Sequence, residues 1–157
     1  MDLIIWRHAE AVDADGSLPG SSLDMARALT TRGEKQARRM AQWLYRQLVD
    51  TARIHASPAL RTERTAQALG RKFKLSEDLS PLATPAQMLS LAQWPDSKAT
   101  VVLVGHQPAL GMLVAGLLGM PEESCAIRKG SVWWLRSRER GGVKQTQLMA
   151  VQAPDFL

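Results

Sequence analysis

The stretch from Val101 to Met120, VVLVGHQPALGMLVAGLLGM, constrains the fold more than any other part of the sequence. It has about the length of a membrane span, but His106, Gln107 and Pro108 interrupt its middle. The Val-Val-Leu-Val run before them is typical of a buried strand, and the apolar residues after Pro108 favour a helix deep in the fold. The segment therefore predicts a strand, a turn and a helix.

The rest of the chain repeats this alternation of short strands and longer helices, which is the pattern of an α/β domain. Strands are expected over residues 2–7, 53–56 and 100–104. Helices are expected over residues 32–48 and 84–94, and two more should begin at residues 58 and 108. The helix that begins at residue 58 is expected to carry Phe73 on its inward face. Residues 131–137 and 143–151 predict a hairpin that closes one edge of the sheet. We expect a three-layer α-β-α fold with a mainly parallel central sheet and an antiparallel C-terminal hairpin, formed by residues 1–157 as a single domain.

Polar residues predict where the helices begin. Thr31 with Glu34 three residues later has the pattern of a capping box. Ser57 and Thr84 are each followed by proline, which indicates an N-cap with proline at the first helical position. The stretch from 11 to 30 has no regular pattern, and irregular segments of this length often line a functional site.

Composition limits the kinds of partner and compartment. The formal net charge of +5 permits anionic partners, but the basic residues are scattered and only 5% of residues are aromatic, so nucleic acid is not an expected partner. Cys125 is the only cysteine, which excludes an internal disulfide and a cysteine-based zinc site. Arg7 and His8 interrupt the first apolar run too early for a signal peptide. We expect a cytoplasmic protein that does not associate with membranes.

Three strand ends carry polar residues that are expected to converge. Arg7 and His8 end the first strand, His106 follows the buried strand, and Arg61 lies in the first turn of the helix after the second strand. In open α/β sheets, ligands bind beyond the carboxyl ends of the strands. Helix N-termini favour anions there, and an arginine fork can hold two phosphate oxygens. These residues therefore predict a phosphoryl site.

Four motifs carry a family resemblance: WRHAEA, LTTRGEKQA, SPALRTERTAQAL and VLVGHQPAL. In this order they resemble the histidine phosphatase superfamily, which has the phosphoglycerate mutase-like fold. The small size of the chain is similar to the compact SixA branch, the phosphohistidine phosphatases. The resemblance covers roughly residues 3–118. It implies that the protein removes phosphate from a histidine-phosphorylated protein, and a histidine phosphotransfer domain is one candidate substrate. The reaction would pass through a covalent phosphohistidine intermediate and would need no cofactor or metal.

The resemblance also implies a role for each site residue. His8 is the nucleophile, provided that its other ring nitrogen donates to a fixed acceptor such as a backbone carbonyl. Arg7, Arg61 and His106 match the phosphate pocket and neutralise charge on the phosphoryl oxygens. Arg27 matches a basic position that binds substrate or phosphate.

Two features bear on the activity. Ala9 stands where the superfamily usually has glycine, and alanine disfavours a positive φ. Small-molecule phosphatases of the superfamily usually carry a carboxylate general acid on an insertion. Here the corresponding segment, residues 75–84, is too short for a lid and holds only Glu77 and Asp78.

Other functions stay open at this point. A phosphomonoesterase for a small phosphorylated substrate would use the same fold, and a non-catalytic module would bind phosphate without turnover. Metal hydrolysis is disfavoured because no zinc-site spacing is present and arginines accompany the histidines. His55, the third histidine, is expected to be structural.

Overall fold

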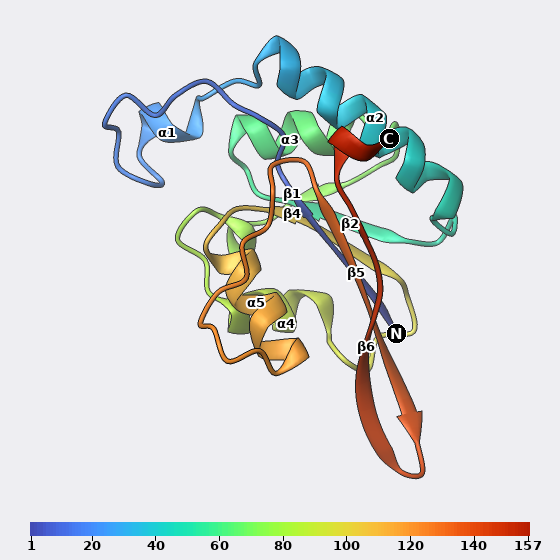
Figure 1. Ribbon diagram of the computed structural model, residues 1–157. Helices are drawn as coiled ribbons and strands as arrows, with labels where there is room; N and C mark the ends of the chain where they lie inside the picture. The colour runs from blue at the N-terminus through green and yellow to red at the C-terminus, as the bar shows by residue number, and fades with distance from the viewer.

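The computed structural model describes all 157 residues, which form a six-stranded sheet between two layers of helices (Figure 1). The strand order is β3-β2-β4-β1-β5-β6. The first four strands pair in parallel and are β1 (Asp2–Arg7), β2 (Arg53–Ala56), β3 (Lys74–Leu75) and β4 (Val101–Gly105). At the other edge β5 (Val132–Arg140) and β6 (Val143–Gln152) pair antiparallel. The expected mainly parallel sheet with a C-terminal edge hairpin is confirmed.

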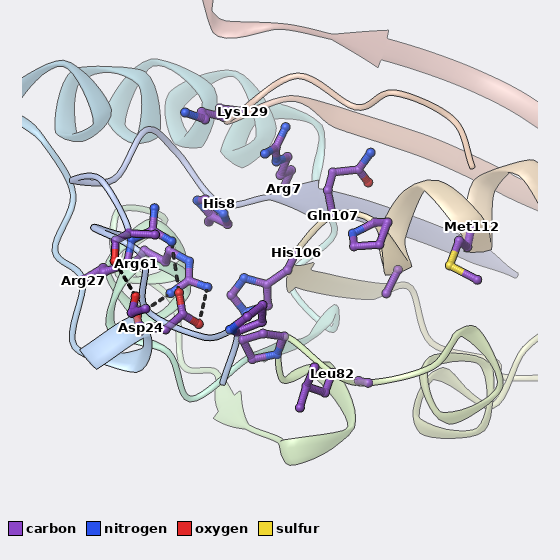
Figure 2. Close-up of a pocket in the computed structure, with 17 residues that line it drawn as sticks. Arg7, His8, Asp24, Arg27, Arg61, Leu82, His106, Gln107, Met112 and Lys129 are labelled. Carbon is purple, nitrogen blue, oxygen red and sulfur yellow. Dashed lines mark hydrogen bonds and ion pairs between the residues drawn. The ribbon is translucent and has the colours of Figure 1, made fainter. Parts of the chain in front are cut away.

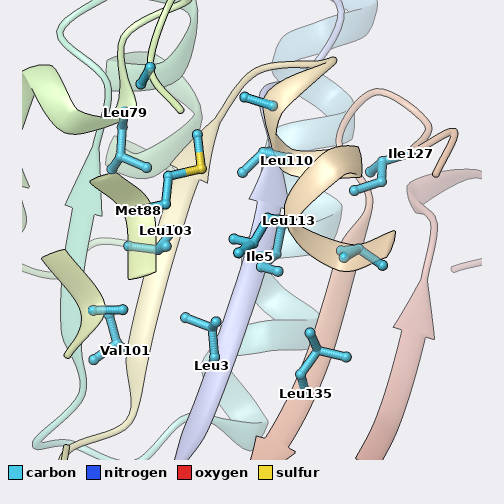
Figure 3. Close-up of a cluster of buried hydrophobic side chains, with 14 of the residues drawn as sticks. Leu3, Ile5, Leu79, Met88, Val101, Leu103, Leu110, Leu113, Ile127 and Leu135 are labelled. Carbon is cyan, nitrogen blue, oxygen red and sulfur yellow. The ribbon is translucent and has the colours of Figure 1, made fainter. Parts of the chain in front are cut away.

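Alternation along β1 gives the sheet two apolar faces. Ile4 and Trp6 pack against α2 (Thr31–Gln47) and α3 (Leu60–Gln67). Leu3 and Ile5 point to the opposite face, which is covered by α4 (Pro85–Ala92) and α5 (Ala109–Leu118) (Figure 3). Each of these four β1 side chains is 0% exposed, and burial of such a side chain contributes roughly 1.5–3 kcal/mol. The two cores hold β1 and β4 in the middle of the sheet.

Two predicted helix starts are wrong. Thr30, not Thr31, caps α2, because its Oγ1 accepts the N–H of Gly33 at 3.0 Å. α3 begins at Leu60 rather than at Pro58, and no side chain caps it. α4 does begin at Pro85 behind a capping box formed by Thr84.

The helix lengths also differ in detail from the prediction. α3 ends at Gln67, so Phe73 lies beyond it. The segment from 11 to 30, expected to be irregular, contains the one-turn helix α1 (Ser22–Met25). Three short elements have no counterpart in the sequence pattern: β3, η1 (Glu77–Leu79) and η2 (Pro154–Phe156). No helix combines the length and the apolar character needed to cross a membrane.

The glycine of the LTTRG motif marks a very close approach between helix and strand end. A Cβ atom added to Gly33 would lie 1.9 Å from the carbonyl oxygen of Glu10. The same carbonyl accepts the N–H of Thr30 at 3.0 Å. The start of α2 is therefore packed directly on the segment that follows β1.

Candidate active site

A cavity of about 460 Å³ opens at the carboxyl ends of β1 and β4 (Figure 2). The structure brings all five predicted site residues to its walls: Arg7, His8, Arg27, Arg61 and His106. Arg7, His8 and His106 converge because β1 and β4 are parallel neighbours in register, with Arg7 opposite Gly105, while Arg61 comes from α3 and Arg27 from the loop after α1. His55 does not line this cavity.

The ring of His8 is held in one tautomer. Its Nδ1 lies 2.7 Å from the carbonyl oxygen of Ala9, and because a carbonyl can only accept, Nδ1 carries the proton. The lone pair is then on Nε2. Burial, followed by the positive charges of Arg61 and Arg7, lowers the pKa of His8 to about 3, although the bond to Ala9 opposes this shift. The imidazole is therefore neutral at pH 7, as a nucleophile requires.

His106 lies beside His8, with 5.3 Å between the ring centroids. Its Nε2 is 2.8 Å from the hydroxyl oxygen of Ser57, which also accepts the N–H of Ala59 at 3.2 Å. A hydroxyl has one proton and two lone pairs, so it can donate to Nε2 or accept from it; the other ring nitrogen, Nδ1, is buried without a partner. Burial lowers the pKa of His106 strongly, so its imidazole is neutral rather than cationic at pH 7.

Ser57 is thus a site residue that the sequence analysis interpreted as a helix cap. It stays outside the helix because its hydroxyl bonds to His106 and to the N–H of Ala59 instead of to the first turn of α3. The residues next to Ser57 in the sequence do not show whether it caps a helix or bonds to His106.

The guanidinium groups of Arg61, which is buried, and Arg7, which is half-buried, each have an N–H donor that no protein atom accepts. Arg7 donates from Nη1 to the carbonyl of Ile127 at 2.6 Å, and Arg61 donates from Nη1 to the carbonyl of Asp24 at 2.8 Å. The Nε atom of each arginine is buried without a partner. Burial lowers the pKa of both, but arginine stays charged at neutral pH. Buried donors on two cations are the groups that a bound anion would satisfy.

Asp24 is the main residue that the sequence analysis missed. Its side chain is 5% exposed, and its carboxylate accepts from Arg61 Nη2 at 3.3 Å, from Arg27 Nη1 at 3.1 Å and from the N–H of Gly20 at 2.9 Å. Burial opposes ionisation, but the bonds from Gly20 and Arg27 and the charge of Arg61 outweigh it and lower the pKa of Asp24. The aspartate is therefore a charged brace between two arginines.

The contacts with Asp24 occupy part of the Arg61 guanidinium group. Both Nη atoms bond to Asp24, one to its carbonyl and one to its carboxylate, whereas Nε has no protein partner. Arg27 is held in the same way, because its Nε donates to the carbonyl of Val12 at 2.8 Å while Nη1 bonds to Asp24. The D-x-x-R spacing, residues 24–27, is the sequence signal that could have identified the pair.

We predict that variants of Asp24 lower the activity without emptying the pocket. Asp24→Ala should lower kcat/KM about 10²-fold, because small misplacements of a catalytic group have effects of that size. Asp24→Asn keeps an oxygen for Gly20 and should lose about tenfold. Asp13→Asn, an exposed carboxylate in the same segment, is the matched control for steady-state assays. An increase in kcat/KM for Asp24→Asn would mean that the carboxylate competes with substrate for Arg61.

Alanine at position 9 fits its place. Ala9 is 0% exposed, and it is not among the residues with positive φ, so it carries no strain that glycine would relieve. Its N–H donates to Thr65 Oγ1 at 3.0 Å, and the same hydroxyl donates to the carbonyl of Arg61 at 2.8 Å. Thr65 thereby ties the end of β1 to α3.

The walls of the cavity differ from one side to the other. Figure 2 shows Leu82 and Met112 on the far side of His106 from Arg27 and Asp24, and Lys129 across the cavity from Leu82. Asp24 is the only acid among the 17 lining residues. Since its pKa is lowered, no wall residue offers a carboxylic acid at neutral pH.

Comparisons with known proteins agree with this geometry. The family model of the histidine phosphatase superfamily (branch 1) matches residues 3–82. Over 125 residues the chain is 35% identical to phosphohistidine phosphatase SixA of Escherichia coli (strain K12), covering 74% of each protein. Over 134 residues it is 29% identical to a phosphohistidine phosphatase SixA homolog of Haemophilus influenzae, covering 76% of this chain and 78% of that protein.

A solved structure is similar over nearly the whole length. The structure of the protein histidine phosphatase SixA complexed with tungstate aligns with a TM-score of 0.79 at 26% identity, covering 99% of both chains. The chain belongs to the histidine phosphatase superfamily.

Proposed function

We propose that the protein is a phosphohistidine phosphatase, which removes phosphate from a histidine-phosphorylated protein through a covalent intermediate on His8. The observation that carries the proposal is the neutral ring of His8, with its free Nε2, in a pocket where Arg7 and Arg61 have unsatisfied donors. The similarity to the SixA proteins supports the substrate class.

The first chemical step transfers the phosphoryl group to His8. The Nε2 lone pair forms a bond to phosphorus as the substrate's P–N bond breaks, and the departing ring nitrogen keeps the electron pair. Arg7 and Arg61 neutralise charge on the three equatorial oxygens in the transition state, and the neutral ring of His106 adds a polar contact. A phosphohistidine ring can carry a proton on its second nitrogen, so it leaves as neutral imidazole without a general acid.

The second step returns His8 to its starting state. Water attacks the phosphorus of the phosphohistidine, the bond to Nε2 breaks, and inorganic phosphate leaves while the proton from water passes to the solution. The Nδ1–H bond to Ala9 is present throughout and keeps the ring in place. Asp24 stays ionised and takes no part in proton transfer.

The cations of the pocket do the work that a metal would do in another phosphatase. Three arginines and Lys129 line the cavity and are opposed by one carboxylate. The proposal therefore includes turnover without a metal or other cofactor. Residues 1–157 would act as one domain without a lid, and the substrate would be a cytoplasmic signalling protein. Activity that EDTA removes and zinc or magnesium restores would contradict the metal-free part.

A substrate panel tests the proposed function. Phosphoramidates should be cleaved far faster than alkyl phosphates, because an alkoxide leaving group is very basic and needs a proton donor. Aryl phosphates, whose leaving groups are weaker bases, should fall between them. Glu77→Gln and Asp78→Asn should barely alter phosphohistidine turnover, since neither residue lines the cavity.

The panel also separates the alternatives. Faster cleavage of alkyl phosphates, or an essential role of either carboxylate, would favour a small-molecule phosphomonoesterase. Phosphate binding without turnover of any substrate would favour a non-catalytic module.

A further inference from the structure

Two of the most exposed leucines of the chain lie at the mouth of the cavity. Leu18 is 75% exposed and stands between Ser17 and Pro19, which both line the cavity. Leu82 is 72% exposed and lies on the opposite loop. The two loops meet, because a Cβ atom added to Gly20 would lie 3.5 Å from Leu82 Cδ1. We call Leu18, Pro19, Pro81 and Leu82 the apolar rim.

The opposite side of the mouth is cationic. Lys129 is exposed, lines the cavity and makes no ion pair, whereas its neighbour Arg128 pairs with Asp155 at 2.7 Å. Figure 2 shows Lys129 and Leu82 on opposite sides of His8 and His106. The phosphoryl site therefore has an apolar flank and a cationic flank.

This arrangement suits a macromolecular substrate better than a small one. A small phosphorylated molecule is held by the arginines inside the cavity and does not need leucines that are 72% and 75% exposed. Apolar groups that gather at a site without being covered by the chain itself are typical of protein interaction surfaces. His8 is only 6% exposed, so the phosphorylated side chain must project into the cavity from a convex element, such as an exposed helix.

We propose that the apolar rim and Lys129 form a docking surface for the protein substrate. The inference rests on the proposed function and adds the chemistry of the partner. The partner presents apolar side chains on one side of its phosphohistidine, where they cover Leu18 and Leu82, and acidic side chains on the other, where they face Lys129. Shape and charge of the mouth then select the protein, while the inner pocket recognises only the phosphoryl group.

The test compares a protein substrate with a small one. A histidine phosphotransfer domain, phosphorylated with phosphoramidate, and phosphoramidate itself are assayed with the Leu18→Ser/Leu82→Ser variant. We expect the ratio of kcat/KM for the domain to kcat/KM for phosphoramidate to fall at least tenfold, mainly through KM for the domain. Leu75→Ser is the control, because Leu75 is 49% exposed and neither it nor its sequence neighbours line the cavity.

Charge reversal tests the cationic flank separately. Lys129→Glu should lower kcat/KM for the domain at low ionic strength, and the loss should shrink as salt is added, since exposed charges are screened. Turnover of phosphoramidate by the same variant should depend much less on salt.

Three results would overturn the docking proposal. An equal loss on both substrates would mean that the leucines only shape the catalytic pocket, and no loss on either would mean that the partner docks elsewhere. A dimer of the wild-type protein that the double serine variant dissociates would assign the rim to self-association. Failure of the wild-type protein to cleave either substrate is a different result, because it removes the proposed function and the docking inference together.

Discussion

Replacing His8 with alanine is expected to lower kcat/KM for a phosphohistidine substrate by a factor on the order of 10⁴ or more, as the loss of a nucleophile commonly does. The wild-type protein should carry an acid-labile, alkali-stable phosphoryl label in rapid-quench samples, and His8→Ala should carry none. The reason is that the bond from Nδ1 to the carbonyl of Ala9 leaves the lone pair of His8 on Nε2, in a ring that lines the cavity.

His55→Ala is the control for this experiment. His55 is half-buried in β2, outside the catalytic cavity, and its loss should leave label and turnover nearly unchanged. A label that persists in His8→Ala would move the nucleophile to another residue, with His106 the first to examine.

Arg61→Ala is expected to lower kcat/KM about 10²- to 10³-fold, because it removes a charge-assisted donor from the developing charge on phosphorus. The Arg61 side chain is 4% exposed, so bulk water does not stabilise the phosphoryl charge in place of the missing guanidinium. Arg61→Lys should recover only part of the loss, since an ammonium group cannot bond to Asp24 and to a phosphoryl oxygen in the same planar arrangement.

Arg64→Ala, one turn further along α3, is the matched control. Arg64 lies on the exposed face and bonds only to Gln67, so its removal should leave kinetics and stability almost unchanged. Near wild-type activity for Arg61→Ala, with the same thermal midpoint, would place Arg61 outside the reaction.

The convergence of Arg7, His8, Arg61 and His106 could be predicted from the sequence because it depends on one rule. Parallel strands present their carboxyl ends at the same edge, and β1 and β4 prove to be neighbours in register. The apolar runs are long enough to identify these strands without knowledge of their neighbours. What each residue contributes to the reaction remains a prediction that the variants above address.

Ser57 and Asp24 could not be predicted because their roles depend on partners distant in the sequence. Ser57 bonds to a histidine 49 positions away, while its local pattern is that of a helix cap. Asp24 pairs with Arg61, 37 positions away, from a helix of only 4 residues. A short polar segment around a carboxylate looks like an ordinary surface loop until the fold supplies the second arginine. Thr30 and Thr31 illustrate a smaller limit, since two adjacent threonines offer equal caps and only the packing of Gly33 on Glu10 fixes the register.

That packing has a consequence for how this enzyme can vary. Gly33 lines no part of the cavity, yet any side chain there would displace the carbonyl of Glu10, which lies two residues after His8. A side chain at this position would therefore disturb the backbone next to the proposed nucleophile, although α2 itself does not line the cavity. The positions that can affect the reaction thus extend beyond the residues that line the cavity.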